Sequence, residues 1–361
     1  MEKTKYQIYN VKRGKLTMSK KKKIIISIIL LLIFALCFIP NQNYNCKNKL
    51  EIISSYGDNQ AYHPKVIAFE NKWNGYKYWM SYTPYPKGED AKENPHIAVS
   101  NDLVTWVSPA DNVNPLDEPE DRQAGKRYNS DSHIVYNNDK NELECYWRYV
   151  DDIENKVYIY RKTSKDGIIW TPKVVTAYSD NRKEKDFISP AIIYENGLYK
   201  IWYVDKNYNV VYATSKDGIL WNDKDKIKLE YPTKLNTWHI DVIHTQKGYE
   251  MITVAWDKWA NRNNMNLYYT LSNDETSFAK TKIILKPSKG AQYWDNKGIY
   301  RSSFIYENGK YYVFYGGTKK NYEHGVGLVY GENIENLHKI DTDFKKTKQV
   351  EKIKRQLQGV K

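Results

Sequence analysis

The chain contains little cysteine: Cys37, Cys46 and Cys145 are the three cysteines in 361 residues. Three cysteines are too few for a disulfide framework or for a zinc site of paired CxxC motifs, and they leave one bridge, Cys46 to Cys145, as an option. The sequence also lacks the GxGxxG, P-loop and HExxH motifs, so it carries no signature of a redox cofactor, a nucleotide or a catalytic zinc. Any chemistry must therefore depend on side chains that the fold brings together.

A basic globular surface is missing as well, although the formal charge of the chain is +13. Residues 1–23 carry nine Lys/Arg against one acid, and residues 338–361 carry eight against three, so the two ends account for the whole excess. The residues between them are neutral in sum, which gives no support to binding of nucleic-acid phosphates. We expect no nucleic-acid partner, and the oligomeric state stays open.

One long apolar run is present, and it lies near the N-terminus. Lys20–Lys23 precede residues 24–39, which are apolar except for Ser27, and Pro40 follows. At about 1.5 Å per residue this run spans about 24 Å as a helix, slightly less than a bilayer core, so the lysines would have to snorkel. We predict an uncleaved transmembrane signal anchor, with the lysines inside and the C-terminal bulk outside the cell. A secreted protein with a cleaved signal peptide and a buried core helix are the alternatives.

Aromatic residues are abundant, and they recur in a pattern. Four segments place Ser first, Asp at plus two and an aromatic ring at plus six, at residues 100–106, 164–170, 215–221 and 272–278. Asp and Gly favour tight turns and the flanking residues alternate as strands do, so each copy predicts a β-hairpin. Further hairpins begin at residues 63, 131, 189, 239 and 301. Five units of two hairpins each predict an all-β fold, a five-bladed β-propeller with four-stranded blades.

These patterns divide the chain into five predicted segments. They are a basic cytoplasmic segment at 1–23, with Met18 as an alternative start, the membrane anchor at 24–39, a linker with a ring-closing strand at 40–60, the propeller at 61–337 and a basic tail at 338–361.

Aligning the five first strands on their apolar pairs places one polar residue of each unit at the same position. These residues are His63, Asp131, Ser189, His239 and Arg301. Because the first strands of a propeller begin on one face near the axis, we expect the five side chains to converge on an axial pocket. Further polar residues predicted on this face are Lys65, His133 and Asp241 from the first strands and Asp151, Asp205 and Asp257 from the second strands.

The units resemble the five-bladed β-propeller glycosidases of the arabinanase, xylosidase and fructosidase superfamily. The resemblance rests on the polar residue before Pro at unit starts, the YENG hairpins at 194–197 and 306–309, and the SNDLVTW turn at 100–106. In that superfamily, acids from the first three units serve as base or nucleophile, as positioning residue and as general acid. Asp131 matches the second acid, whereas His63 and Ser189 stand where the first and third are expected.

The resemblance implies a carbohydrate-active protein that acts on cell-wall or extracellular polysaccharide. As an enzyme it would use Asp131 and Asp241 as a carboxylate pair with His63 as a proton carrier. The predicted substrate-binding residues are His239, Arg301, Ser189, His133, Asp151, Asp205 and Asp257. We predict no dedicated metal site, although an axial Ca²⁺ or another cation is known in the resembled families. The alternative function is a non-catalytic propeller that binds glycan during polysaccharide export or assembly.

Overall fold

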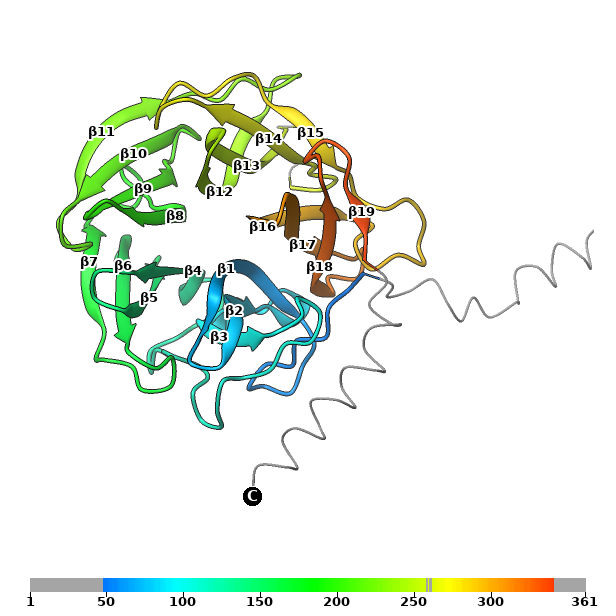
Figure 1. Cartoon of the computed structure of the whole chain (residues 1–361). Coiled ribbons are helices and arrows are strands. Elements are labelled where there is room, and N and C mark those ends of the chain that lie inside the picture. Colours follow the sequence, from blue (N-terminus) through cyan, green and yellow to red (C-terminus); the bar gives the residue numbers. More distant parts are fainter. Residues whose placement is uncertain (1–47, 258, 260–261, 341–361) are drawn as a thin grey trace, which may run out of the picture. The chain divides into compact units, whose positions relative to one another are not determined.

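Five antiparallel sheets surround a central axis in the computed structural model, which describes residues 48–257, 259 and 262–340 (Figure 1). This arrangement confirms the predicted five-bladed β-propeller. No helix among the described residues is long and apolar enough to cross a membrane. The predicted anchor at 24–39 lies outside the described residues, as do Cys37, Cys46 and most of the basic tail.

Each sheet runs outward in chain order from an inner strand. The first sheet contains β1 (Ala61–Trp73), β2 (Tyr76–Pro84) and β3 (His96–Ser100), and the second contains β4 (Arg127–Asn137), β5 (Glu142–Asp151), β6 (Lys156–Ser164) and β7 (Val174–Ser179). The third contains β8 (Ile188–Glu195), β9 (Leu198–Val204), β10 (Val210–Ser215) and β11 (Asn222–Ile227). The fourth contains β12 (Asn236–Thr245), β13 (Gly248–Trp256), β14 (Leu267–Ser272) and β15 (Lys282–Leu285). The fifth contains β16 (Gly298–Glu307), β17 (Lys310–Thr318), β18 (His324–Gly331) and β19 (His338–Lys339).

The first sheet has three strands, one fewer than the sequence predicts. In place of a fourth strand, Val99 and Val107 exchange two backbone hydrogen bonds in an isolated bridge. Two short 3-10 helices, η1 (Pro86–Gly88) and η2 (Asp90–Lys92), lie in the connection between β2 and β3. This connection contributes residues to the site described below.

The four repeated turns are held by their Asp side chains, as the sequence predicts. In the turn after β6, the Asp166 carboxylate accepts the backbone N–H groups of Ile168 and Ile169. Asp102, Asp217 and Asp274 bond in the same way to the residues two and three positions further on. These bonds satisfy backbone donors that no strand partner reaches, which explains why the same residue types recur in each unit.

The apolar core is divided among the interfaces between neighbouring sheets. Five clusters of buried side chains each join residues of two adjacent sheets, and large rings such as Trp79, Trp147 and Trp202 are almost completely buried. At the junction between the fifth and first sheets, Lys49 bridges Gly327 of β18 and Glu51 bridges Thr105. The apolar clusters lie between the sheets, and the inner strands carry buried polar side chains near the axis.

Candidate functional site

The five aligned polar residues lie at the beginnings of the inner strands and are all buried. Each of these strands has a register shift there, between Tyr62 and Lys65 in β1 and at matching places in β4, β8, β12 and β16. His63, Asp131 and Ser189 adopt positive φ angles of 49°, 53° and 55°. A bulge of this kind re-aims one side chain out of the strand's regular alternation. Repeated around the axis, it turns these side chains toward a common site.

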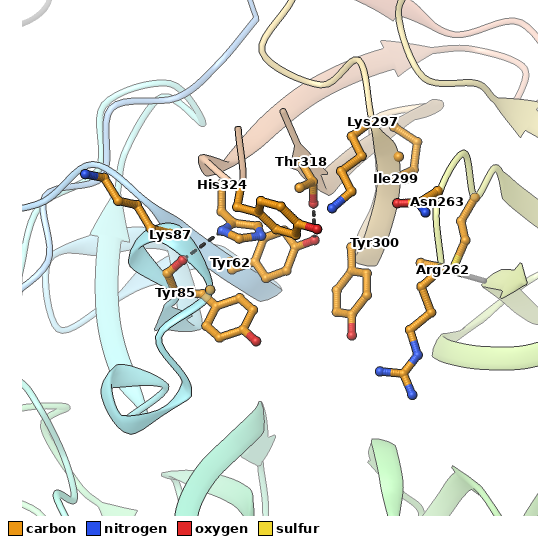
Figure 2. Close-up of a pocket in the computed structure, with 14 residues that line it drawn as sticks. Tyr62, Tyr85, Lys87, Arg262, Asn263, Lys297, Ile299, Tyr300, Thr318 and His324 are labelled. Carbon is orange, nitrogen blue, oxygen red and sulfur yellow. Dashed lines mark hydrogen bonds between the residues drawn. The ribbon is translucent and has the colours of Figure 1, made fainter. Parts of the chain in front are cut away.

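Two cavities adjoin at this end of the propeller. The smaller, of about 240 Å³, is lined by His63, Asp131 and His239 and by charged residues of several sheets. The larger, of about 530 Å³, is shown in Figure 2 and shares Tyr85, Arg262 and Tyr300 with the smaller. A third cavity, of about 420 Å³, is lined by the far ends of the inner strands and is therefore separate from this site.

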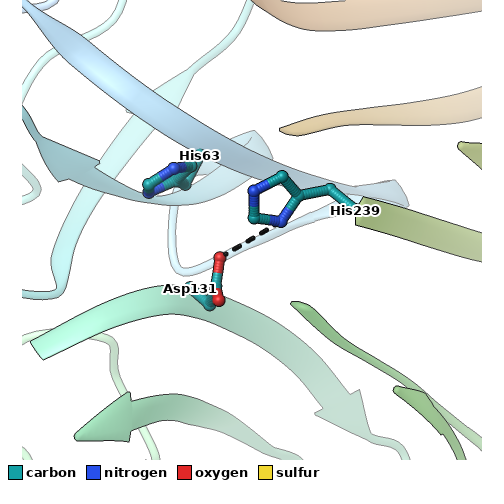
Figure 3. A group of neighbouring side chains, drawn as sticks. All are labelled: His63, Asp131 and His239. Carbon is teal, nitrogen blue, oxygen red and sulfur yellow. Dashed lines mark ion pairs between the residues drawn. The ribbon is translucent and has the colours of Figure 1, made fainter. Parts of the chain in front are cut away.

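His63, Asp131 and His239 form a compact cluster in the smaller cavity (Figure 3). One ligand atom from each lies within 4.8 Å of the others, and Asp131 Oδ1 is 3.5 Å from His239 Nδ1. The side chains come from β1, β4 and β12, three separate sheets. Two ligands bonded to one divalent ion at ~2.1 Å lie roughly 3.5 Å apart at a tetrahedral angle, so this spacing suits a shared cation.

The Asp131 carboxylate is surrounded by cationic or ionisable groups. Its Oδ1 lies 3.4 Å from Arg301 Nη1, and its Oδ2 accepts a hydrogen bond of 3.2 Å from the Ser189 backbone N–H. Burial alone would raise the pKa of this carboxyl, but His239, Arg301 and His63 together hold the pKa well below its usual range. Asp131 therefore supplies a fixed negative charge at neutral pH.

The two histidines of the cluster are neutral at the same pH. Burial lowers the pKa of His63 to about 3, and burial lowers the pKa of His239 well below its usual range. His63 Nδ1 lies 2.8 Å from Thr83 Oγ1 and 3.3 Å from Glu93 Oε1, so a neutral ring that donates from Nδ1 keeps a lone pair on Nε2. A carboxylate behind one ring nitrogen is the usual way in which proteins orient a metal-binding histidine.

The cluster also leaves polar atoms without hydrogen-bond partners. Among the described residues, His63 Nε2, Asp131 Oδ1 and both ring nitrogens of His239 are buried and make no hydrogen bond. Buried polar atoms are rarely unsatisfied, and several at one point indicate a missing ion or water. Two imidazoles and one carboxylate are a donor set that divalent transition metals accept, with coordination positions left open. The residues present therefore fit a divalent cation.

Glu93 is the site residue that the sequence analysis missed. It follows η2 in the connection between β2 and β3, lines the smaller cavity and is buried. Burial and the nearby Asp131 raise the pKa of its carboxyl well above the usual range. Since Glu93 lies in a connection and not on an inner strand, the strand alignment could not place it beside His63. The only available signal was the acidic run from Glu89 to Glu93.

The other predicted residues have varied surroundings. Ser189 Oγ bonds both to the backbone N–H and to the carbonyl of Ile240, and Arg301 donates to the Pro190 carbonyl, so both brace neighbouring strands beside Asp131. Asp241 accepts a 2.7 Å hydrogen bond from Lys65, and neither residue lines the smaller cavity. His133 Nε2 contacts the Ile192 backbone at 2.9 Å.

The three acids of the second strands lie at turns. Asp151 accepts the backbone N–H groups of Ile153 and Glu154, and Asp205 accepts those of Asn207 and Asn209. Asp257 accepts the backbone N–H of Trp259 in the same manner. None of the three acids is among the residues that line the smaller cavity. Their predicted part in substrate binding stays a prediction.

Known carbohydrate-active enzymes resemble the chain. The A type blood N-acetyl-α-D-galactosamine deacetylase of Flavonifractor plautii is 31% identical over 304 residues, which cover 71% of this chain and 39% of that protein. The chain thus spans about two fifths of the relative's length. A crystal structure of an N-acetylgalactosamine deacetylase from F. plautii, in complex with blood group B trisaccharide, matches with a TM-score of 0.70 at 23% identity, covering 80% of this chain and 94% of that one.

Arabinanases resemble the chain in fold at lower identity. An exo-1,5-α-L-arabinanase from a bovine ruminal metagenomic library has a TM-score of 0.56 at 16% identity, covering 75% of this chain and 93% of that one. The α-L-arabinanase of Cellvibrio cellulosa, complexed with arabinohexaose, has a TM-score of 0.55 at 12% identity, covering 75% and 91%. The fold is that of the five-bladed β-propeller glycosidases. No protein family model matches the chain. This scaffold agrees with the resemblance drawn from the repeats.

Proposed function

We propose that this propeller removes the acetyl group from an N-acetylated sugar of a glycan, with a divalent cation held by His63, Asp131 and His239. The observation that carries the proposal is the group of unsatisfied ligand atoms of these residues within 4.8 Å of one another. The sequence similarity to a deacetylase supports the choice of an amide bond rather than a glycosidic bond. An N-acetylated glycan is therefore the proposed partner.

The reaction adds water to the acetyl carbon and breaks the carbon–nitrogen bond, and it yields acetate and a free amino sugar. A divalent cation at this position would act as a Lewis acid on the acetyl carbonyl. Asp131 holds the negative charge that a cation requires, and the neutral imidazoles of His63 and His239 supply nitrogen lone pairs. Thr83 and Glu93 fix the ring of His63 through its Nδ1 atom.

Glu93 is the residue that we assign to proton transfer. Its carboxyl lines the smaller cavity and lies 3.3 Å from His63 Nδ1. Because its pKa is raised, the carboxyl would give its proton to the nitrogen of the leaving amine, and the carboxylate that results would take up the proton of the attacking water. Arg301, 3.4 Å from Asp131, helps to keep that carboxylate ionised.

Glycosidic hydrolysis is the second candidate, because three acids, Asp90, Glu93 and Asp131, line the same cavity. Two carboxyls about 5 to 9.5 Å apart suffice for that chemistry. Glycosidic hydrolysis, however, does not explain why imidazole nitrogens of His63 and His239 lie beside the Asp131 carboxylate without hydrogen bonds. The proposal therefore ranks deacetylation first.

Product analysis separates the two reactions. Protein loaded with Zn²⁺, Mn²⁺ or Co²⁺ is incubated with a panel of N-acetylated oligosaccharides, and acetate and reducing ends are both measured. We expect acetate without new reducing ends. New reducing ends without acetate would favour the glycosidase. Neither product, with oligosaccharide bound, would favour a binding propeller.

We also propose that residues 24–39 anchor the protein in the cell membrane with the propeller outside. The run of apolar residues after Lys20–Lys23 supports this location. Full-length protein should sediment with membranes, and external protease should release the propeller by cutting between residues 41 and 60. Full-length protein in the medium with a new N-terminus near residue 40 would contradict the anchor.

A further inference from the structure

The charged side chains that line the larger cavity, beside the proposed cation site, are all positive. Its lining includes Lys87, Arg262 and Lys297, and among the described residues it includes no Asp or Glu. The cations come from different sheets: Lys87 from the β2–β3 connection, Arg262 from the β13–β14 connection and Lys297 from the residue before β16. In Figure 2, Lys87 lies to the left of Tyr62 and Lys297 lies to its right, above Tyr300.

Two of these cations, Arg262 and Lys297, lie against aromatic rings. The Arg262 guanidinium lies 3.7 Å from the centre of the Trp238 ring, and Lys297 Nζ lies 3.3 Å from the centre of the Tyr322 ring. Within the described chain, none of the three cations forms an ion pair with an acid, whereas lysines such as Lys200 contact two glutamates. One unpaired surface cation means little, but three around one hollow concentrate positive potential there.

Aromatic rings also line the cavity. The Tyr62 ring is stacked with Tyr300 at 4.9 Å and 12°, and with Tyr85 at 5.9 Å and 23°. Rings at the rim of a sugar site offer flat apolar faces to the C–H face of a pyranose. Tyr85 and Tyr300 belong to both cavities, so a ligand that extends out of the cation site must pass along them.

We infer that the larger cavity binds an oxyanion substituent, a carboxylate or a sulfate ester, on a sugar that neighbours the N-acetylated one. This inference rests on the proposed function, because it gives that function a substrate class: acidic N-acetylated glycans. Lys297 and Arg262 would contact the oxyanion, and Lys87 would add to the positive potential of the cavity. An arginine is suited to that contact because its planar fork binds carboxylate and sulfate oxygens.

Binding measurements on three matched tetrasaccharides test the inference. The probes are unsulfated chondroitin, its sulfated form and its carboxyl-reduced neutral form, titrated into the protein by calorimetry at low and high salt. We expect at least one acidic form to bind about tenfold more tightly than the neutral form, which corresponds to about 1.4 kcal/mol, with a preference that declines as salt rises. If unsulfated chondroitin already binds more tightly than the neutral form, the recognised group is the carboxylate. If only the sulfated form does, the recognised group is the sulfate.

The variant Lys297→Gln should remove most of this preference and leave binding of the neutral form unchanged. Lys216→Gln is the matched control, because Lys216 lies in the turn after β10 and does not line the cavity. This variant should behave as wild type. Equal affinity for all three probes, or an unchanged preference in Lys297→Gln, would overturn the inference. The titrations use chelator-treated protein, so binding is measured without turnover, and absence of acetate release in a separate assay would count against the proposed function and leave this result standing.

Discussion

Cation binding at His63, Asp131 and His239 should stabilise the folded chain by a measurable amount. A ligand that binds only the folded state at 100 times its Kd adds about 2.7 kcal/mol to the free energy of unfolding. For a propeller of about 280 residues, this corresponds to a rise in Tm of roughly 5 °C. Thermal unfolding of chelator-treated protein, with and without added Zn²⁺, Mn²⁺ or Co²⁺, measures the rise.

The variants make this test specific to the cluster. His239→Ala removes one ligand and should abolish the rise, whereas His244→Ala removes a half-exposed histidine from the far end of the same strand and should retain it. Asp131→Asn should also abolish the rise, although it leaves the buried Arg301 without its partner at 3.4 Å and should lower the starting Tm. An equal rise in His239→Ala and wild type, or no rise in wild type with any of the three ions, would refute the assignment.

Three further predictions concern the proton carrier, pH and the blades. Glu93→Gln should lower the rate of acetate release by about 10²- to 10⁴-fold and leave the cation-induced rise in Tm intact, and a rate near that of wild type would remove Glu93 from the mechanism. Because the pKa of His63 falls to about 3 in the fold, the unfolded chain binds more protons between pH 6.5 and 3. As pH falls through that window, this group should therefore lower the free energy of unfolding of the cation-free protein by up to roughly 1.4 kcal/mol per pH unit. Urea unfolding at pH 7 and pH 5 measures the loss. Gly167→Ala places a Cβ 2.1 Å from the Trp79 ring, whereas Gly197→Ala has a similar positive φ and open space, so urea unfolding should show Gly167→Ala to be less stable than its control by about 1–3 kcal/mol.

The repeats allowed much of the fold to be predicted, because the same turn and the same strand bulge recur in the units of the propeller. Asp166 and its counterparts recur where backbone N–H groups need a partner at the same turn of each blade. The polar residues at strand starts recur for a related reason, since each inner strand bulges there and turns one side chain inward. Aligning the strands was therefore enough to bring His63, Asp131 and His239 together.

Residues outside the repeats could not be predicted in this way. Glu93 reaches the cavity through a connection whose path depends on tertiary contacts, including the hydrogen bonds of Asn94 to Tyr56 and of Asn129 to Asn94. Asp241 lies two residues beyond the aligned position of its strand, and alternation alone could not reveal that Lys65 Nζ lies 2.7 Å from its carboxylate. The proposed cation site was not predicted as a dedicated metal site, because its three ligands lie far apart in the sequence, without the short spacing of a metal motif.

Acetate release before and after removal of the cation tests the account most directly. Wild-type protein, its chelator-treated form and the same sample after titration with a divalent ion are compared on one N-acetylated oligosaccharide, with metal content measured in parallel. The account predicts that activity disappears with the cation and returns in proportion to the ion bound, up to one per chain, and that His239→Ala neither retains the ion nor recovers activity. Undiminished acetate release from protein shown to be free of metal would contradict it.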